Sequence, residues 1–211
     1  MGDHWRSHFA AGVHSDWFGA CDAVRAGDVC GIHAGPSRQR LHTLPTGDDR
    51  YPAVAALPKR DRFDLLWELA NDRYVYGGSF DVSQRDFALR EWEKSRKYAE
   101  DLVRLAPEFS SDPQYGAALL NGNLMLAFVA TEHGETRSAL KYLREATEAP
   151  ATPGMGFIAG PWQTICKRLV ERGKKSAVMD FLDRIAQKVP VEKTRMLAIA
   201  AQLRDGQKPS W

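Results

Sequence analysis

The chain has 211 residues, of which 44% are hydrophobic and 27% are charged, and its 29 Lys and Arg residues nearly balance 27 Asp and Glu residues. This length and composition are ordinary for a globular chain with a core of its own, and the formal net charge of +2 argues against a dedicated nucleic-acid or polybasic membrane binder. No apolar stretch approaches the ~20 residues that a membrane helix needs.

The cysteines and the opening sequence predict a cellular setting. Three cysteines cannot all pair with one another, which excludes a disulfide framework. The opening sequence, MGDHWRSHFA, lacks the apolar segment of a secretory signal. We therefore expect a soluble cytoplasmic protein that has no contact with a membrane.

Residues 1–60 differ in composition from the rest of the chain. They contain no Glu, but they hold five of the six histidines and two of the three cysteines. Residues 31–49 are rich in Gly, Pro and Thr, which is typical of a loop, and only residues 15–26 have the pattern of a short helix. We interpret residues 1–60 as a weakly ordered N-terminal arm and residues 61–211 as a helical domain.

Helical patterns follow one another from residue 61 onwards. A capping box formed by Ser83 and Asp86 predicts the start of a long helix that ends at Pro107. Asp112 followed by Pro113 predicts the start of the next helix. No segment alternates apolar and polar residues as a half-buried strand does, so we expect an all-α fold. The remaining helices are predicted over residues 61–74, 135–148, 161–173, 174–189 and 190–204.

Two of the predicted helix pairs share one pattern of residues. Counted from Asn123 and from Trp162, apolar or small residues and a glycine recur at offsets of 3, 4, 7, 11, 16, 20 and 23. The glycines of this pattern, Gly134 and Gly173, are expected to end the first helix of each pair in a left-handed turn. The matched residues are Leu126, Ala127, Ala130, Gly134, Ala139, Leu143 and Ala146 in the first pair, and Ile165, Cys166, Leu169, Gly173, Val178, Leu182 and Ile185 in the second.

This pattern resembles the tetratricopeptide repeat, in which small residues let paired helices approach and a proline closes the pair. A less regular copy begins at Trp67, so the resemblance covers residues 62–190, and the stretch from KYAEDLVRLAPEF to FLDRI is also similar to bacterial repeat proteins of unassigned function. The spacing from Gly134 to Gly173 is longer than the repeat length of the family, which favours an irregular stack of antiparallel helix pairs. Residues 190–204 would form the helix that covers its C-terminal end.

The resemblance implies a function in protein binding, because the first helices of such repeats line a concave groove. We expect this groove to bind a peptide or a partner protein without chemistry or a cofactor. An open alternative is that the arm, which carries four large aromatic residues, covers Leu124 and Phe128. Self-association is also open, because short repeat arrays often associate. The groove positions are Asp72, Tyr76, Asn121, Leu124, Phe128, Gln163 and Lys167.

A second reading is a metal-dependent or enzymatic protein whose arm closes over the groove. Histidine and cysteine side chains are suitable ligands for soft metals, and the candidates in the arm are His4, His8, Cys30 and His33. The spacing Cys-x8-Cys is not that of a zinc knuckle, so we assign no metal site and no catalytic residue. Cys166 occupies a small-residue position of the repeat and is expected to be a buried core group.

Two further patterns have a structural and a functional interpretation. Cations gather around the helix end near residue 173, where they complement the helix dipole, and a phosphate- or RNA-binding patch is the alternative. The letters GMGFIA, over residues 154–159, match a dinucleotide fingerprint, but the buried strand that this motif requires is not predicted before them. We interpret them as a linker. The clustered cations are Lys167, Arg168, Arg172, Lys174 and Lys175.

Overall fold

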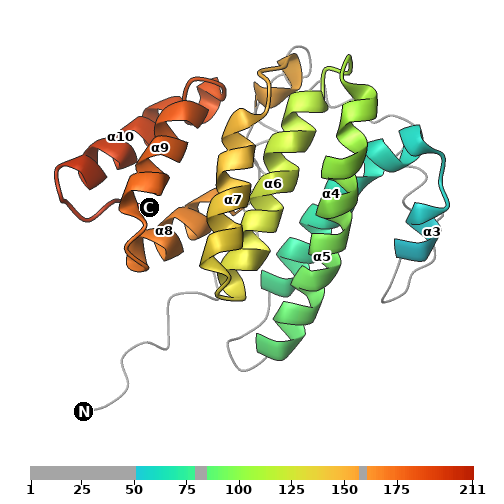
Figure 1. The fold of residues 1–211 in the computed structure, drawn as a ribbon, viewed down its shortest axis with the longest axis horizontal. Helices are drawn as coiled ribbons and strands as arrows, with labels where there is room; N and C mark the ends of the chain where they lie inside the picture. Colours follow the sequence, from blue (N-terminus) through green and yellow to red (C-terminus); the bar gives the residue numbers. More distant parts are fainter. Residues whose placement is uncertain (1–50, 79–84, 157–160) are drawn as a thin grey trace, which may run out of the picture. The chain divides into compact units, whose positions relative to one another are not determined.

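The computed structural model describes residues 51–78, 85–156 and 161–211. These residues form eight α-helices and no strand, which confirms the all-α class (Figure 1). Three short 3₁₀ helices, η2 to η4, lie between them. The α-helices are α3 (Tyr51–Ala55), α4 (Lys59–Gly78), α5 (Arg85–Leu105), α6 (Tyr115–Glu132), α7 (Thr136–Glu148), α8 (Trp162–Glu171), α9 (Lys175–Ile185) and α10 (Lys193–Arg204).

The described helical region begins at Tyr51, before the predicted boundary at residue 61. Val54 of α3 is fully buried, and the ring centroid of Tyr51 lies 5.7 Å from that of Tyr98 on α5. At the start of α4, Lys59 donates hydrogen bonds of 2.6 and 2.8 Å to Glu108. Residues 51–60 are therefore part of the helical unit, and the average composition of residues 1–60 concealed them.

Most of the described helices pack against a neighbour in the sequence. α4 packs against α5, α5 against α6, α6 against α7, and α9 against α10, while α6 also contacts α4 and α8 (Figure 1). Residues 116–131 of α6 are all buried apart from Leu119, which is half-buried. Apart from Asn121 and Asn123, the sequence of α6 is almost wholly apolar or small around its circumference, so this helix can lose water on every side. It therefore forms the centre of the core.

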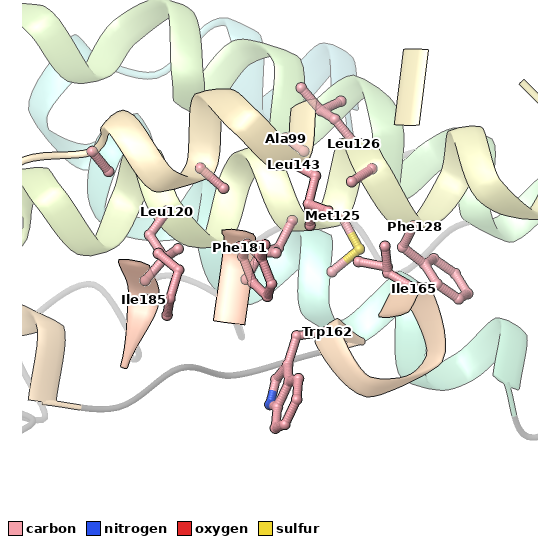
Figure 2. Close-up of a cluster of buried hydrophobic side chains, with 14 of the residues drawn as sticks. Ala99, Leu120, Met125, Leu126, Phe128, Leu143, Trp162, Ile165, Phe181 and Ile185 are labelled. Carbon is pink, nitrogen blue, oxygen red and sulfur yellow. The ribbon is translucent and has the colours of Figure 1, made fainter. Parts of the chain in front are cut away.

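Figure 2 shows side chains of α5, α7, α8 and α9 converging on α6. Met125 lies in the middle of this cluster, and Leu143 approaches it from α7 and Ile165 from α8. Because burial of large apolar side chains is the main favourable term in folding, this cluster holds these helices together. Its labelled members are Ala99, Leu120, Met125, Leu126, Phe128, Leu143, Trp162, Ile165, Phe181 and Ile185.

The predicted left-handed turns are confirmed. Gly134 and Gly173 have φ angles of +79° and +73°, values that favour glycine because it has no Cβ. In each turn the amide of the following residue donates to a carbonyl oxygen five positions earlier, which is the Schellman motif. The two bonds have the same length, 2.8 Å, from Glu135 to Ala130 and from Lys174 to Leu169.

Ser83, the first residue of the predicted capping box, lies outside the described residues. The predicted helix starts that are described agree with the structure apart from small differences. The carboxylate of Asp112 accepts a 2.7 Å hydrogen bond from the Gln114 N–H, so it caps the turn that leads into α6. The helix predicted to begin at Pro190 starts with the 3₁₀ turn η4 (Pro190–Glu192) before α10. Among the described helices, none is both long enough and apolar enough to cross a bilayer.

Candidate functional site

The groove positions predicted on α6 lie in the core. Leu124 is fully buried, Phe128 is 3% exposed and Asn121 is 7% exposed. The ring of Phe128 meets that of Trp92 edge-on, with 5.0 Å between the centroids. These three side chains are therefore not open to a partner in this structure, contrary to the prediction, because the neighbouring helices cover α6 on every side.

The remaining groove positions are distributed differently. On α8, Gln163 is half-buried and Lys167 is exposed. The side chains of Asp72 and Tyr76 lie outside the described part of the structure. The alternative in which the arm covers Leu124 and Phe128 also involves residues outside it.

An open depression lies instead between α7 and α9. A basic part of about 530 Å³ and an apolar part of about 190 Å³ share Leu140 and Arg144, so they form one surface feature, which we call the α7–α9 groove. The basic part is lined by Thr136, Arg137, Leu140, Lys141, Arg144 and Lys174. The apolar part is lined by Leu140, Leu143, Arg144, Thr147, Ala177, Asp180 and Phe181.

The basic part presents four cations. Lys141 lies 3.8 Å from Glu145 and Arg144 lies 3.9 Å from Glu148, and the two cationic side chains are 57% and 70% exposed. Exposed pairs of this kind contribute little to stability. Arg137 and Lys174 form no ion pair with an acidic side chain among the residues that the structure describes. The groove therefore has a positive surface whose charge is only partly neutralised.

The apolar part has a closed floor. Leu143 and Phe181 are almost fully buried beneath it, whereas Leu140 and Ala177 are half-buried at its sides. The acidic residue of this part, Asp180, already accepts a 2.9 Å hydrogen bond from Arg184. An apolar group placed here would contact carbon atoms on both sides, so this part can hold the side chain of a bound segment.

Two of the cations near residue 173 contact the end of α6. Arg172 donates a 2.9 Å hydrogen bond to the carbonyl oxygen of Thr131, and Arg168 lies 3.7 Å from Glu132, so both neutralise the C-terminal end of α6. Two of the five clustered cations are thus engaged within the chain. Of the other three, Lys174 lines the α7–α9 groove.

Lys188 makes the equivalent contact at the end of α7. Its ammonium group donates 2.6 Å hydrogen bonds to the carbonyl oxygens of Thr147 and Ala149. Burial lowers the pKa of Lys188, and the positive charge of Arg184 adds to this, while Glu148 opposes it. The carbonyl groups that α7 leaves unpaired at its end are therefore bound by the next helix pair.

The other candidate chemical groups have structural places. Cys166 is fully buried, and this burial raises the pKa of its thiol, which confirms the interpretation as a core group. Gly154 lies in η3 (Pro153–Gly156), and its N–H donates a 2.9 Å hydrogen bond to Pro113, so this part of GMGFIA fastens the connector after α7. The described residues contain no group of three His, Cys, Asp or Glu side chains that could hold a metal ion. His4, His8, Cys30 and His33 lie outside those residues.

Part of the α7–α9 groove can be recognised in the sequence, although the groove positions implied by the repeat family do not include it. Arg137, Lys141 and Arg144 follow one another at helical spacings of four and three, which places them on one face of α7, and Leu140 lies between them. A charged helix face of this kind is usually just exposed to solvent. This one is a candidate binding surface because the fold places Lys174 and Phe181 beside it.

Comparison with known proteins adds no functional assignment. No family model, no curated protein and no solved structure matches this chain. The α7–α9 groove combines cations, hydroxyl groups and an apolar floor, which are groups for binding a ligand by charge and shape.

Proposed function

We propose that the chain is a scaffold of tetratricopeptide-like helix pairs that binds a peptide or a partner protein. The observation that carries this proposal is the α7–α9 groove, an open surface with an apolar floor beside a cationic part. Grooves of this composition recognise peptide segments by seating an apolar side chain and pairing charges around it. A cytoplasmic setting, expected from the sequence, is part of the proposal.

The pairing of helices supports the repeat arrangement. In a stack of repeats, each helix pair contacts its neighbour through equivalent helices. Here α6 contacts α8 and α7 contacts α9, while α6 and α8 end in the same left-handed turn. The contacts of Arg172 with Thr131 and of Lys188 with Ala149 join one pair to the next. These relationships favour a continuous scaffold, with its open face on α7 and α9.

Selection of binding peptides tests this function. A displayed library of random peptides, each about 16 residues long, is panned on the full chain, and the affinity of enriched peptides is measured by fluorescence anisotropy. We expect Leu140→Ser to weaken binding about tenfold, because Leu140 is common to both parts of the groove. Leu197→Ser is the matched control, since Leu197 is also a half-buried leucine, on α10.

Two results would contradict this function. Circular dichroism and the midpoint of thermal unfolding establish that both variants are folded. If no peptide is enriched, or if the two folded variants bind the enriched peptides equally well, the α7–α9 groove is not a peptide-binding surface.

A further inference from the structure

The cations of the α7–α9 groove form a row with a definite length. Arg137, Lys141 and Arg144 span two turns of α7, which corresponds to about 10 Å along the helix axis at ~1.5 Å per residue. An extended peptide covers this length with about three residues, at ~3.3 Å each. A ligand with two or three carboxylates in a short segment can therefore meet the whole row.

The existing ion pairs of the row are weakly held. Lys141 precedes Glu145, and Arg144 precedes Glu148, so in each i,i+4 pair the cation is N-terminal to the acid, which is the less favourable order on a helix. Other pairs of the chain are much closer, such as Lys59 with Glu108 at 2.6 Å. The groove cations can thus exchange their present partners for a ligand carboxylate at little loss.

The opposite side of the groove adds a further positive charge. Lys174 lies in the turn between α8 and α9 and lines the basic part together with Arg137. Neither is paired with an acidic side chain in the part of the chain that the structure describes. A carboxylate between them would therefore be attracted by both cations without displacing an internal ion pair.

From this charge pattern we infer that the ligand of the α7–α9 groove is an acidic peptide segment of a partner protein with one apolar side chain among its carboxylates. The carboxylates pair with Arg137, Lys141 and Lys174, and the apolar side chain lies above Leu143 and Phe181. This inference rests on the proposed function and specifies the class of its ligand.

The apolar floor favours a peptide over a nucleic acid. Single-stranded nucleic acids need exposed aromatic rings on which their bases stack. The aromatic ring of the groove, that of Phe181, is only 1% exposed, so a base has no open ring face to stack on. An aliphatic or aromatic side chain of a peptide, in contrast, gains from contact with Leu140 and Ala177.

Charge reversal tests the inference in the full chain. Arg137→Glu/Lys174→Glu is compared with Lys97→Glu/Lys193→Glu, which changes the net charge by the same amount at two exposed lysines on α5 and α10. The probes are the enriched library peptides and a single-stranded RNA of about 20 nucleotides. We expect the enriched peptides to be acidic. We also expect their association rate to fall about tenfold with the first variant, to remain within about twofold with the second, and to decrease with added salt.

Four outcomes would overturn the inference. Enriched peptides that are neutral or basic, or equal losses in the two charge variants, would leave the peptide-binding function standing but remove the acidic ligand. RNA binding that only the groove variant weakens would assign the cations to a nucleic acid. Dimerisation in sedimentation that only the groove variant abolishes would assign the groove to a second copy of the chain. An empty selection, by contrast, contradicts the proposed function itself.

Discussion

Gly116 of α6 lies directly against the carbonyl group of Pro150, so closely that a Cβ atom on Gly116 would overlap the carbonyl oxygen. The same Cβ would lie 2.8 Å from the hydroxyl oxygen of Thr152 and 3.0 Å from the sulfur of Met155. The connector after α7 is therefore pressed onto the first turn of α6. This contact holds residues 150–155 against α6.

Gly116→Ala is expected to destabilise the protein by about 1–3 kcal/mol, because the connector backbone must move to make room for the methyl group. Urea unfolding followed by circular dichroism measures the change in the free energy of unfolding. Gly122→Ala is the comparison, since its Cβ would meet a side-chain methyl of Val103 at 2.7 Å, which can yield more easily than backbone. A Gly116→Ala variant as stable as the wild type would contradict the contact.

Gly134→Ala and Gly173→Ala are expected to destabilise the protein equally, by about 1–2 kcal/mol each. No atom lies within 4 Å of the Cβ that either substitution adds, so the whole effect comes from the positive φ. The same urea titrations measure it. Clearly unequal losses would show that the two turns are not equivalent, which would weaken the proposed repeat.

Lys188→Met is expected to lower the free energy of unfolding by about 1–3 kcal/mol, because the carbonyl oxygens of Thr147 and Ala149 lose a charged donor. Methionine retains most of the aliphatic length. The matched control is Lys193→Met, which removes an exposed lysine on α10. Equal stability of the two variants would mean that Lys188 does not join the helix pairs.

Asp112 gives the stability of the protein a defined dependence on pH. Burial opposes ionisation of this carboxyl group, but the hydrogen bonds from the Gln114 N–H and from Arg60 outweigh burial and lower the pKa of Asp112. With a pKa below that of the unfolded chain, Asp112 stabilises the fold fully above pH ~4, and this contribution is lost as the pH falls through the folded-state pKa.

Asp112→Ala is therefore expected to cost about 1 kcal/mol at pH 7, and its difference from the wild type should shrink below pH ~4. Urea titrations between pH 3 and pH 7 measure this difference. Asp64→Asn is the control with the opposite slope, because burial raises the pKa of Asp64 although Arg60 lowers it. The wild type should thus gain stability relative to Asp64→Asn as the pH falls. Parallel slopes for the two variants would contradict these assignments.

The helix ends were the most predictable part of the fold. A left-handed backbone conformation favours glycine, so Gly134 and Gly173 indicated the two turns in the sequence. Asp112 indicated the turn before α6, because aspartate is a favoured capping residue. Residues 51–55 contain no comparable glycine or capping residue. Their short helix is held by contacts with α5 that are distant in sequence, and a composition average cannot detect those.

The open face was only partly predictable from the sequence, which shows the cationic face of α7 but not what lies beside it. The α6 sequence has no distinct polar face, so its pattern could not indicate which side, if any, is exposed, and the repeat family's geometry implied Leu124 and Phe128, which are buried. The groove that the structure does expose depends on where α9 lies beside α7. Its floor residue Phe181 lies on α9 and Leu140 on α7, far apart in the chain, and no local pattern connects the two.

Acetylation rates of lysines in the full chain, measured by mass spectrometry with and without a selected peptide, test the location of the binding surface most directly. We predict that the peptide slows acetylation of Lys141 and Lys174 and leaves that of Lys193 unchanged. Lys167, on the groove that the repeat resemblance implied, should also remain unaffected. Protection of Lys167 instead of Lys141 and Lys174 would contradict the account and return the binding surface to the α8 side of the molecule.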